Sequence, residues 1–261
     1  MEKILSFRRL NKDKNINKKM EKEMTLKERI KNLILPNELN EDLAYFCGVL
    51  AGDGSIGYRE KKKEYCIKCV GNPKDEQEYY NILIKDLIKK LFNLDIKPKF
   101  HDKKTTYGFS LYSKSILRYL TEFIGLPLGK KYDKLKIPEI FMNNKKLVKS
   151  FISGVADTDF HLAIKRKNYP VIKGTSKSKS FMEEIKRFLE SEGFKVCMYE
   201  RKQFDERVNK ENITHDIELS GYKQFLKWID EIGFKHPKNQ EKIKLLIDIS
   251  LAKIKVSPNE V

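Results

Sequence analysis

The sequence of 261 residues predicts an α+β fold made of two αββαββα units, which form a pseudo-twofold saddle of two antiparallel four-stranded sheets. An internal repeat is the main observation behind this prediction. Residues 43–54 (LAYFCGVLAGDG) and 149–160 (KSFISGVADTDF) align without gaps at an offset of 106, which is 159 − 53. A similar offset of 108 (215 − 107) matches two more segments, residues 107–111 with 215–219 and residues 117–126 with 225–234. Two nearly equal offsets so far apart along the chain indicate a duplicated unit.

The hydrophobic pattern of the first unit predicts an apolar helix, a hairpin, an amphipathic helix, a second hairpin and a closing helix. We expect helices at about 43–53, 74–92 and 115–124, and strands at about 55–59, 64–71, 96–101 and 106–112. The amphipathic helix carries apolar residues at helical spacing on one face, namely Ile82, Leu83, Leu87, Ile88 and Leu91.

The second unit repeats this order and adds a last helix. We expect helices at about 149–159, 177–192, 222–232 and 240–253, and strands at about 160–166, 169–174, 194–202 and 213–220. The order α-β-β-α-β-β-α is typical of antiparallel sheets with helices packed on one face.

The repeat divides the chain into a basic N-terminal extension (1–40), a first repeat (41–148), a second repeat (149–253) and a C-terminal tail (254–261). The extension holds 11 Lys plus Arg against 6 acidic residues. It forms either a short basic helix around 21–34 or a partly disordered segment, and the sequence leaves both readings open.

The charge of the chain favours a polyanionic partner. Its 54 Lys plus Arg against 37 Asp plus Glu leave a net charge of +17, and binding to phosphates would release condensed counterions. Genome bias or heat adaptation is the alternative reading, but heat adaptation raises Lys and Glu together, whereas here Lys exceeds Glu by far. Nucleic acid is therefore the expected partner.

Other features of the composition predict a folded intracellular protein. Hydrophobic residues make up 40% of the chain, enough for a substantial core. No stretch approaches the ~20 apolar residues of a membrane span, and the N-terminus lacks a signal-peptide pattern, so we expect a cytoplasmic location. Cys66 and Cys69 have metal-site spacing, but they lie in a predicted strand without a second pair. We expect them to be core thiols.

The two apolar helices carry small residues where a core helix would have Leu or Ile. At positions i, i+3, i+4 and i+7 these stripes hold Ala44, Cys47, Gly48 and Ala51 in the first helix, and Ser150, Ser153, Gly154 and Asp157 in the second. Glycine inside a helix costs about 1 kcal/mol relative to Ala, and small stripes let two backbones approach closely. The stripes therefore predict that the two helices pack together as a helix seam between the repeats.

Such a seam would bring Asp53 and Asp159 side by side at the two helix C-termini. The negative end of each helix dipole and the repulsion between like charges disfavour this arrangement. A cation would make it favourable, and oxygen ligands suit Mg²⁺. A purely structural role for both carboxylates is the alternative.

From about residue 41 to 250 the sequence resembles the LAGLIDADG homing endonucleases of the two-motif, single-chain type. Residues 46–54 (FCGVLAGDG) match the first motif, with the ending AGDG that is common among archaeal members. Residues 152–160 match the second motif and retain Gly154, Asp157 and Asp159, but Phe160 stands where the family usually has Gly.

The resemblance implies a site-specific endonuclease that hydrolyses both strands of double-stranded DNA and binds it in the major groove. It implies a monomer, intron-encoded or free-standing, that needs no protein partner and no membrane. Mg²⁺ would be the cofactor, with Mn²⁺ able to substitute. The implied metal ligands are Asp53 and Asp159 with their neighbours Gly52 and Thr158, and the implied catalytic residues are Asp53, Asp159, Lys130 and Lys238.

The residues that would contact DNA are basic side chains on the exposed sheet faces and in the hairpin loops, because a β-ribbon fits the major groove. The candidates are Arg59, Lys61, Lys63, Lys68, Lys97, Lys99, Lys165, Arg166, Lys167, Lys173, Arg201 and Lys202. The alternative for each is a solvated strand face. Aromatic residues such as Tyr45, Phe46, Phe151 and Trp228 are expected in the core instead.

Two other functions compete with the endonuclease. A protein of the same fold could bind nucleic acid without cleaving it, as an RNA splicing maturase or a transcription regulator does. The presence of both motif carboxylates favours the enzyme. An intein is disfavoured because the standard splicing residues are missing at the two ends of the sequence. A histidine-based nuclease is disfavoured because the four histidines lack metal-ligand spacing.

Overall fold

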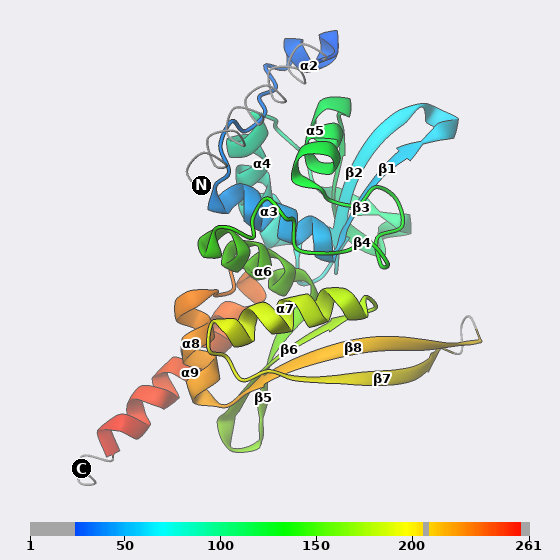
Figure 1. Cartoon of the computed structure of the whole chain (residues 1–261). Coiled ribbons are helices and arrows are strands. Elements are labelled where there is room, and N and C mark those ends of the chain that lie inside the picture. The colour runs from blue at the N-terminus through cyan, green and yellow to red at the C-terminus, as the bar shows by residue number, and fades with distance from the viewer. Residues whose placement is uncertain (1–23, 206–208, 257–261) are drawn as a thin grey trace, which may run out of the picture.

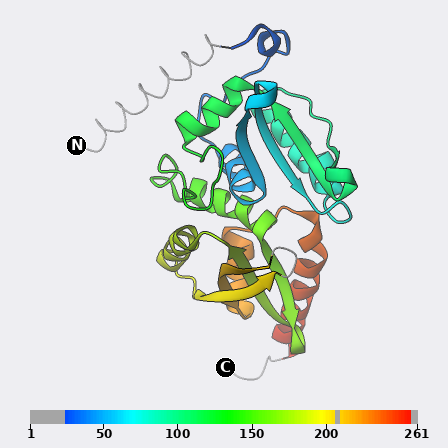
Figure 2. The same cartoon turned by 90° about the vertical axis from the view of Figure 1, so that its right-hand side faces the viewer.

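The computed structural model describes residues 24–205 and 209–256. Two four-stranded antiparallel sheets organise this part of the chain, with strand orders β1-β2-β4-β3 and β5-β6-β8-β7. Helices α3 (Glu41–Gly52) and α6 (Lys145–Asp159) lie between the two units (Figure 1). In both views α2 lies at the far end of the first unit, and α9 runs from the middle of the molecule towards the far end of the second (Figures 1 and 2). The predicted α+β class with two antiparallel four-stranded sheets is confirmed.

The first unit follows the predicted order of elements. After α3 come β1 (Gly54–Arg59), β2 (Glu64–Gly71), a π-helix (Tyr79–Ile84) that continues into α4 (Lys85–Phe92), β3 (Lys99–His101), β4 (Thr106–Tyr112), and α5 (Lys114–Arg118), which continues into a second π-helix (Tyr119–Ile124). Short 3₁₀ turns at Glu60–Lys62 and Asp102–Lys104 connect the hairpin strands. Ser113 caps α5 by accepting a hydrogen bond from the backbone N–H of Ile116.

The second unit has the same strand order and a longer second hairpin. After α6 come β5 (Phe160–Lys165), a 3₁₀ turn (Arg166–Asn168), β6 (Tyr169–Ser176), α7 (Lys179–Ser191), β7 (Cys197–Asp205), β8 (Lys210–Ser220), α8 (Tyr222–Glu231) and α9 (Pro237–Val256). No helix within the described ranges is both long and apolar enough to span a membrane.

One difference from the sequence prediction concerns the helix expected at 74–92. The segment Tyr79–Ile84 is π-helical, so its residues per turn differ from those of an α-helix. Tyr79, Tyr80 and Ile84 are buried as a result, whereas Ile82 is 56% exposed. The prediction that Ile82 shares the buried face with Leu87 and Leu91 was therefore wrong.

The N-terminal segment docks on the first unit through a buried carboxylate. Helix α2 (Leu26–Ile30) starts with a capping box between Thr25 and Glu28. Glu28 also accepts hydrogen bonds from the hydroxyl of Ser113 and from the backbone N–H of Ser115 at 3.1 Å. The backbone N–H of Ile34 donates to Phe92 O at 3.2 Å. Part of the predicted N-terminal extension is therefore packed structure, while residues 1–23 lie outside the described ranges.

Candidate active site at the helix seam

Helices α3 and α6 touch backbone to backbone along the seam. A Cβ at Gly48 would overlap the carbonyl oxygen of Phe151, and a Cβ at Gly154 would overlap the carbonyl oxygen of Tyr45. Each helix thus needs a glycine where the other helix's backbone passes. The remaining stripe residues, Ala44, Cys47, Ala51, Ser150, Ser153 and Asp157, are all buried.

The seam brings together the ends of the two helices. A Cβ at Gly52 would overlap the Thr158 hydroxyl and lie 3.3 Å from Cγ of Asp159. Asp53 is the C-cap of α3, and Asp159 is the last residue of α6. Burial first, and then the charges of Asp159 and Glu76, raise the pKa of Asp53 to about 7. Burial likewise raises the pKa of Asp159 to about 6, against the opposing effect of two lysines.

Lys131 reaches this pair from the loop that follows the second π-helix. Its Nζ donates to the carbonyl oxygens of Gly52 and Gly54, the latter at 2.8 Å. Burial lowers the pKa of Lys131, and the nearby carboxylates of Asp159 and Asp53 oppose this fall only in part. The ammonium group therefore lies beside both carboxylates. It also donates a hydrogen bond to the carbonyl oxygen of Gly52, a residue that the family resemblance implied as a metal ligand.

The family resemblance implied Lys130 at this place, whereas the lysine that reaches the helix ends in the structure is Lys131. Lys130 is exposed. Gly129 has φ of +79° and donates its N–H to Ile56 O at 2.8 Å, which turns the chain. After that turn Lys131, and not Lys130, faces the helix ends. The spacing of the repeat could not distinguish two adjacent lysines.

Lys238 approaches the same centre from the start of α9. Its Nζ lies 3.6 Å from Oε1 of Glu76, a buried carboxylate of the first unit. A Cβ at Gly71 would overlap Oε2 of Glu76, so the glycine at the end of β2 leaves room for this side chain. Burial raises the pKa of Glu76, and Lys238 opposes the rise. The sequence analysis missed Glu76, because its position follows no repeated motif.

A buried polar network fixes the loop that carries Lys238. Tyr45 OH donates to Oδ2 of Asp157 at 2.6 Å, and the backbone N–H of Lys235 donates to the same oxygen at 2.9 Å. Burial, and then the charge of Lys238, lower the pKa of His236 to about 3, so this ring is neutral. Its Nδ1 accepts a hydrogen bond from the backbone N–H of Lys238 at 3.1 Å. Asp157 thus links the seam to the loop.

The charges at the centre do not balance. Asp53, Asp159 and Glu76 contribute three negative charges and Lys131 and Lys238 two positive ones, which leaves one negative charge (3 − 2) when all are ionised. Carboxylate oxygens are the ligands that divalent cations such as Mg²⁺ prefer. Thr158 directs its hydroxyl hydrogen to Val155 O at 2.9 Å, and a hydroxyl that donates keeps its oxygen lone pairs for a cation.

Phe160 replaces the expected glycine without disturbing the end of α6. It is the C-cap with φ of −109° and ψ of 160°, which any residue adopts. Its ring packs 5.9 Å from that of Trp228 and fills the space above Gly174. In the first unit a Cβ at Gly54 would overlap backbone atoms of Leu50, so the two helix ends differ locally.

The candidate DNA-contact residues divide into paired and unpaired groups. By strand alternation, Arg59, Lys68, Lys99, Lys165, Lys173 and Arg201 lie on the polar faces of the sheets, and Lys202 lies on the opposite face of β7. Four of them have carboxylate partners: Lys68 with Asp102, Lys165 with Glu218, and both Lys173 and Arg201 with Asp216. Lys61, Lys63 and Arg166 lie in hairpin turns, and Lys97 precedes β3. The side chain of Lys167 falls outside the described part.

Comparison with known proteins identifies the domain type. Residues 146–233 match the family model described as a LAGLIDADG-like domain. An uncharacterized protein of Methanocaldococcus jannaschii is 25% identical over 199 residues, which are 74% of this chain and 69% of that protein. The replication factor C small subunit of the same organism is 28% identical over 216 residues, which are 82% of this chain but 10% of that protein. The second name therefore describes a protein of which this chain spans a small part.

Solved structures of I-DmoI share the fold. I-DmoI in complex with DNA and Mn gives a TM-score of 0.53 at 18% identity and covers 75% of this chain and 98% of that chain. The complex with DNA and Ca gives 0.52 at 17% identity, over 74% and 88% of the two chains. A variant with its target DNA and Mg gives 0.52 at 18% identity, over 74% and 95%.

Proposed function

We propose that this chain, which has the fold of the homing endonuclease I-DmoI and carries a LAGLIDADG-like domain, is a metal-dependent endonuclease that cuts both strands of double-stranded DNA at a specific site. One observation carries the proposal. Two helices that touch through Gly48 and Gly154 place Asp53 and Asp159 together, with a lysine reaching the centre from each unit.

Asp53 and Asp159 would hold the metal, for which Mg²⁺ is the best candidate. Two carboxylates with raised pKa values and a surplus negative charge fit a divalent cation. A bound Mg²⁺ activates water and stabilises the leaving oxygen of a phosphodiester. The I-DmoI complexes described above contain Mn, Ca or Mg together with DNA, which supports a divalent ion for this fold.

Lys131 and Lys238 would bind the oxygens of the phosphate that is cut. Each ammonium group lies beside a carboxylate of the centre, Lys131 near Asp159 and Lys238 near Glu76. A fixed positive charge stabilises negative charge that develops on the phosphate in the transition state, and it does so more strongly in a buried site than in water. Because one lysine comes from each unit, each would serve one DNA strand.

The polar faces of the two sheets would lie along the DNA major groove. They carry basic side chains at alternating positions, including Arg59 and Lys99 in the first unit and Lys165 in the second. The ion pairs of Lys68, Lys165, Lys173 and Arg201 leave these side chains partly neutralised. The contribution of these four to affinity should therefore be smaller than that of basic side chains without a carboxylate partner.

A non-cleaving DNA-binding protein of the same fold is the second candidate. One contact favours it: the Lys131 ammonium group donates hydrogen bonds to the carbonyl oxygens of Gly52 and Gly54. Each of these oxygens keeps a lone pair, but the positive charge of Lys131 beside them disfavours a divalent cation as a further partner. The two candidates share the DNA-binding surface and differ only at the carboxylate pair, so a cleavage test separates them.

The decisive experiment is selection from a randomised library of duplex DNA with Mg²⁺, in which bound and cut molecules are sequenced separately. The wild-type chain should both bind and cut. Asp53→Asn and Asp159→Asn should each abolish double-strand cleavage while leaving binding largely intact, because neither change alters the sheet faces. Amide replacement removes like-charge repulsion, so stability in metal-free buffer should hold or rise. Binding without any cutting by the wild type, with Mg²⁺ or Mn²⁺, would establish the second candidate.

A further inference from the structure

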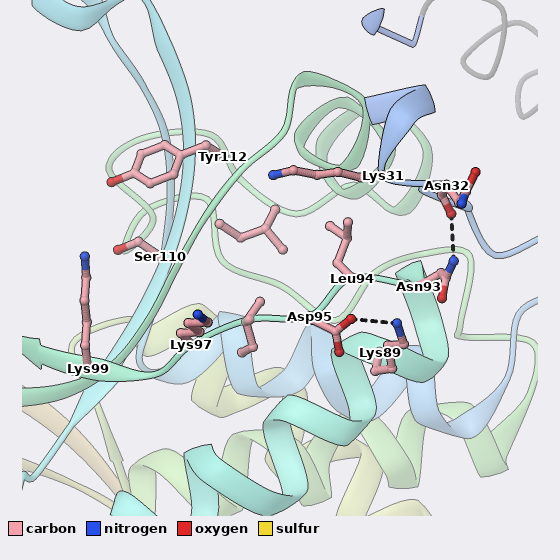
Figure 3. A pocket seen from close by; sticks show the side chains of 12 residues that line it. Lys31, Asn32, Lys89, Asn93, Leu94, Asp95, Lys97, Lys99, Ser110 and Tyr112 are labelled. Atoms are coloured by element: carbon pink, nitrogen blue, oxygen red, sulfur yellow. Dashed lines mark hydrogen bonds and ion pairs between the residues drawn. The ribbon is translucent and has the colours of Figure 1, made fainter. Parts of the chain in front are cut away.

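A basic pocket lies on the first unit, away from the carboxylate pair. Its volume is about 640 Å³, and it is bounded by the N-terminal segment, the end of α4, the chain leading into β3, and β4. Figure 3 shows Lys31 pointing from the N-terminal segment toward Tyr112, with Lys97, Lys99 and Ser110 around the same space. The pocket therefore combines the polar face of the sheet with a segment outside the repeat.

The pocket exists because the edge strand of the first sheet ends early. Strand β3 pairs with β4 only from Thr106 to Gly108, two residues short of Ser110. In the second unit the matching position is Glu218, which is 108 residues further on, and it pairs with Cys197 of β7. The first unit thus leaves open an edge that the second unit fills with a strand.

The N-terminal segment closes the outer side of this opening. Asn32 has φ of 49°, and its carbonyl oxygen accepts a hydrogen bond from Nδ2 of Asn93 at 2.9 Å. Leu33 next to it is buried in the core, and Glu28 fixes α2 to Ser113 and Ser115. These contacts hold Lys31 at the wall of the pocket, although it precedes the first repeat.

The charge of the pocket is strongly positive. Four lysines and one aspartate line it, which gives a net charge of +3 (4 − 1). Lys89 and Asp95 form an ion pair at 2.8 Å and cancel each other. Among the described residues, Lys31, Lys97 and Lys99 have no carboxylate within ion-pair distance. The hydroxyls of Ser110 and Tyr112 add polar groups at the same wall.

Part of the pocket wall belongs to the polar face of the first sheet. Lys99 pairs with Gly108 in β4, so Lys99, Gly108, Ser110 and Tyr112 all lie on that face. Phe109 is level with Gly54, the first residue of β1, which directly follows Asp53. Tyr112 lies three residues further along β4, or about 10 Å further out. A duplex lying over the centre and along this face would continue past the pocket.

We propose that this pocket binds phosphates of the backbone of duplex DNA, in the flank beyond the stretch that lies over Asp53 and Asp159. The inference rests on the proposed DNA-binding function. Three uncompensated ammonium groups with hydroxyl donors beside them suit phosphodiester oxygens, and such contacts position a duplex without reading its sequence. The N-terminal segment is then part of the DNA-binding surface. The first unit makes additional phosphate contacts that have no counterpart at the matching position of the second unit.

The test measures how fast single lysines of the full-length chain are acetylated, with and without a long random-sequence duplex. Lys31 and Lys97 should become protected together with Lys61 and Lys63 of the first hairpin. Lys223 is the control, because it is exposed on α8, a helix that packs against the other side of the second sheet. Inorganic phosphate at the same phosphate concentration should protect none of them.

A second measurement uses the salt dependence of DNA binding. The double variant Lys31→Ala, Lys97→Ala should lower the slope of log K against log salt by about 1 per lysine, whereas Lys223→Ala should leave it unchanged. Protection of Lys61 and Lys63 without Lys31 and Lys97, or an unchanged slope of log K against log salt in the double variant, would contradict phosphate binding by the pocket. Neither result would contradict the proposed function. Protection by inorganic phosphate alone would assign the pocket to a small anion instead. A wild-type chain that binds no duplex removes both proposals.

Discussion

At the scale of single residues, the two adjacent lysines 130 and 131 have different surroundings. Lys131 is half-buried against the helix ends, and Lys130 is exposed. Lys131→Met should therefore reduce the rate of DNA cleavage by about 10²-fold, the typical effect of removing one charge-stabilising donor, with little change in DNA binding. Lys130→Met is the matched control and should cut like the wild type. Equal rates for both variants in a single-turnover assay would contradict the assignment of Lys131.

The three carboxylates of the site show what the sequence could and could not predict. Asp53 and Asp159 were predictable, because each ends a helix whose glycine recurs in register. Glu76 was not predictable, because it depends on a gap left by Gly71 and on a partner, Lys238, in the other unit. Residues at repeated positions can be found from spacing alone, whereas contacts across the units depend on tertiary packing.

At the scale of secondary-structure elements, the α3–α6 contact depends on two glycines. Gly48→Ala would gain about 1 kcal/mol of helix propensity, but its Cβ would overlap Phe151 O. Backbone atoms cannot move aside as a flexible side chain can, so we expect a net loss of about 1–3 kcal/mol in the free energy of unfolding, as for other overpacked cores. Denaturant titration measures this loss.

Gly57→Ala is the control for this prediction. Gly57 lies in β1, and a Cβ there meets nothing within 4 Å. Its variant should unfold within about 0.5 kcal/mol of the wild type, as surface substitutions usually do. A Gly48→Ala variant as stable as Gly57→Ala would mean that the helices do not touch as closely as described.

The docking of α2 should depend on pH through Glu28. Burial would raise the pKa of Glu28, but hydrogen bonds from Ser113, Thr25 and Ser115 outweigh it and lower the pKa to about 2. A lowered folded-state pKa adds stability above the ordinary value of 4.5, and this stability is lost as pH falls from 4.5 towards 2. The contribution at neutral pH is about 2–3 kcal/mol.

Glu28→Gln should therefore lower the stability of the chain at neutral pH and flatten its pH dependence below pH 4.5. Glu38→Gln is the control, because Glu38 is exposed in the same N-terminal region. Denaturant titrations of both variants at several pH values give the comparison. If the two curves coincide, Glu28 does not hold the segment.

The π-helix at Tyr79–Ile84 marks the limit of prediction for elements. A pattern with a period of 3.6 residues placed Ile82 in the core, but the wider π turn buries Tyr79 and Tyr80 instead. Tyr79 OH then lies 2.9 Å from Tyr45 OH in the network that supports the site. Local periodicity predicted that a helix exists here, and tertiary contacts decided its register.

At the scale of the whole molecule, duplication explains why the fold was predictable. Two copies of one pattern gave two chances to recognise each element, and the strand orders of the two sheets are the same. The differences between the copies were not predictable. β3 spans three residues and β7 nine. At the pocket, β3 stops opposite Gly108, whereas β7 continues two residues past the matching Asp216 to Glu218, so strand residues occupy the matching place in the second unit.

Duplication also predicts the state of assembly. A chain with one such helix would have to dimerise to bury its small-residue stripe, but here α3 and α6 bury theirs against each other within one chain. No second copy is then needed to complete the carboxylate pair, so we expect a monomer. Sedimentation equilibrium should give a mass near 30.8 kDa, with and without Mg²⁺. A stable species of twice that mass would contradict the prediction, because the symmetric centre would then have to lie between chains.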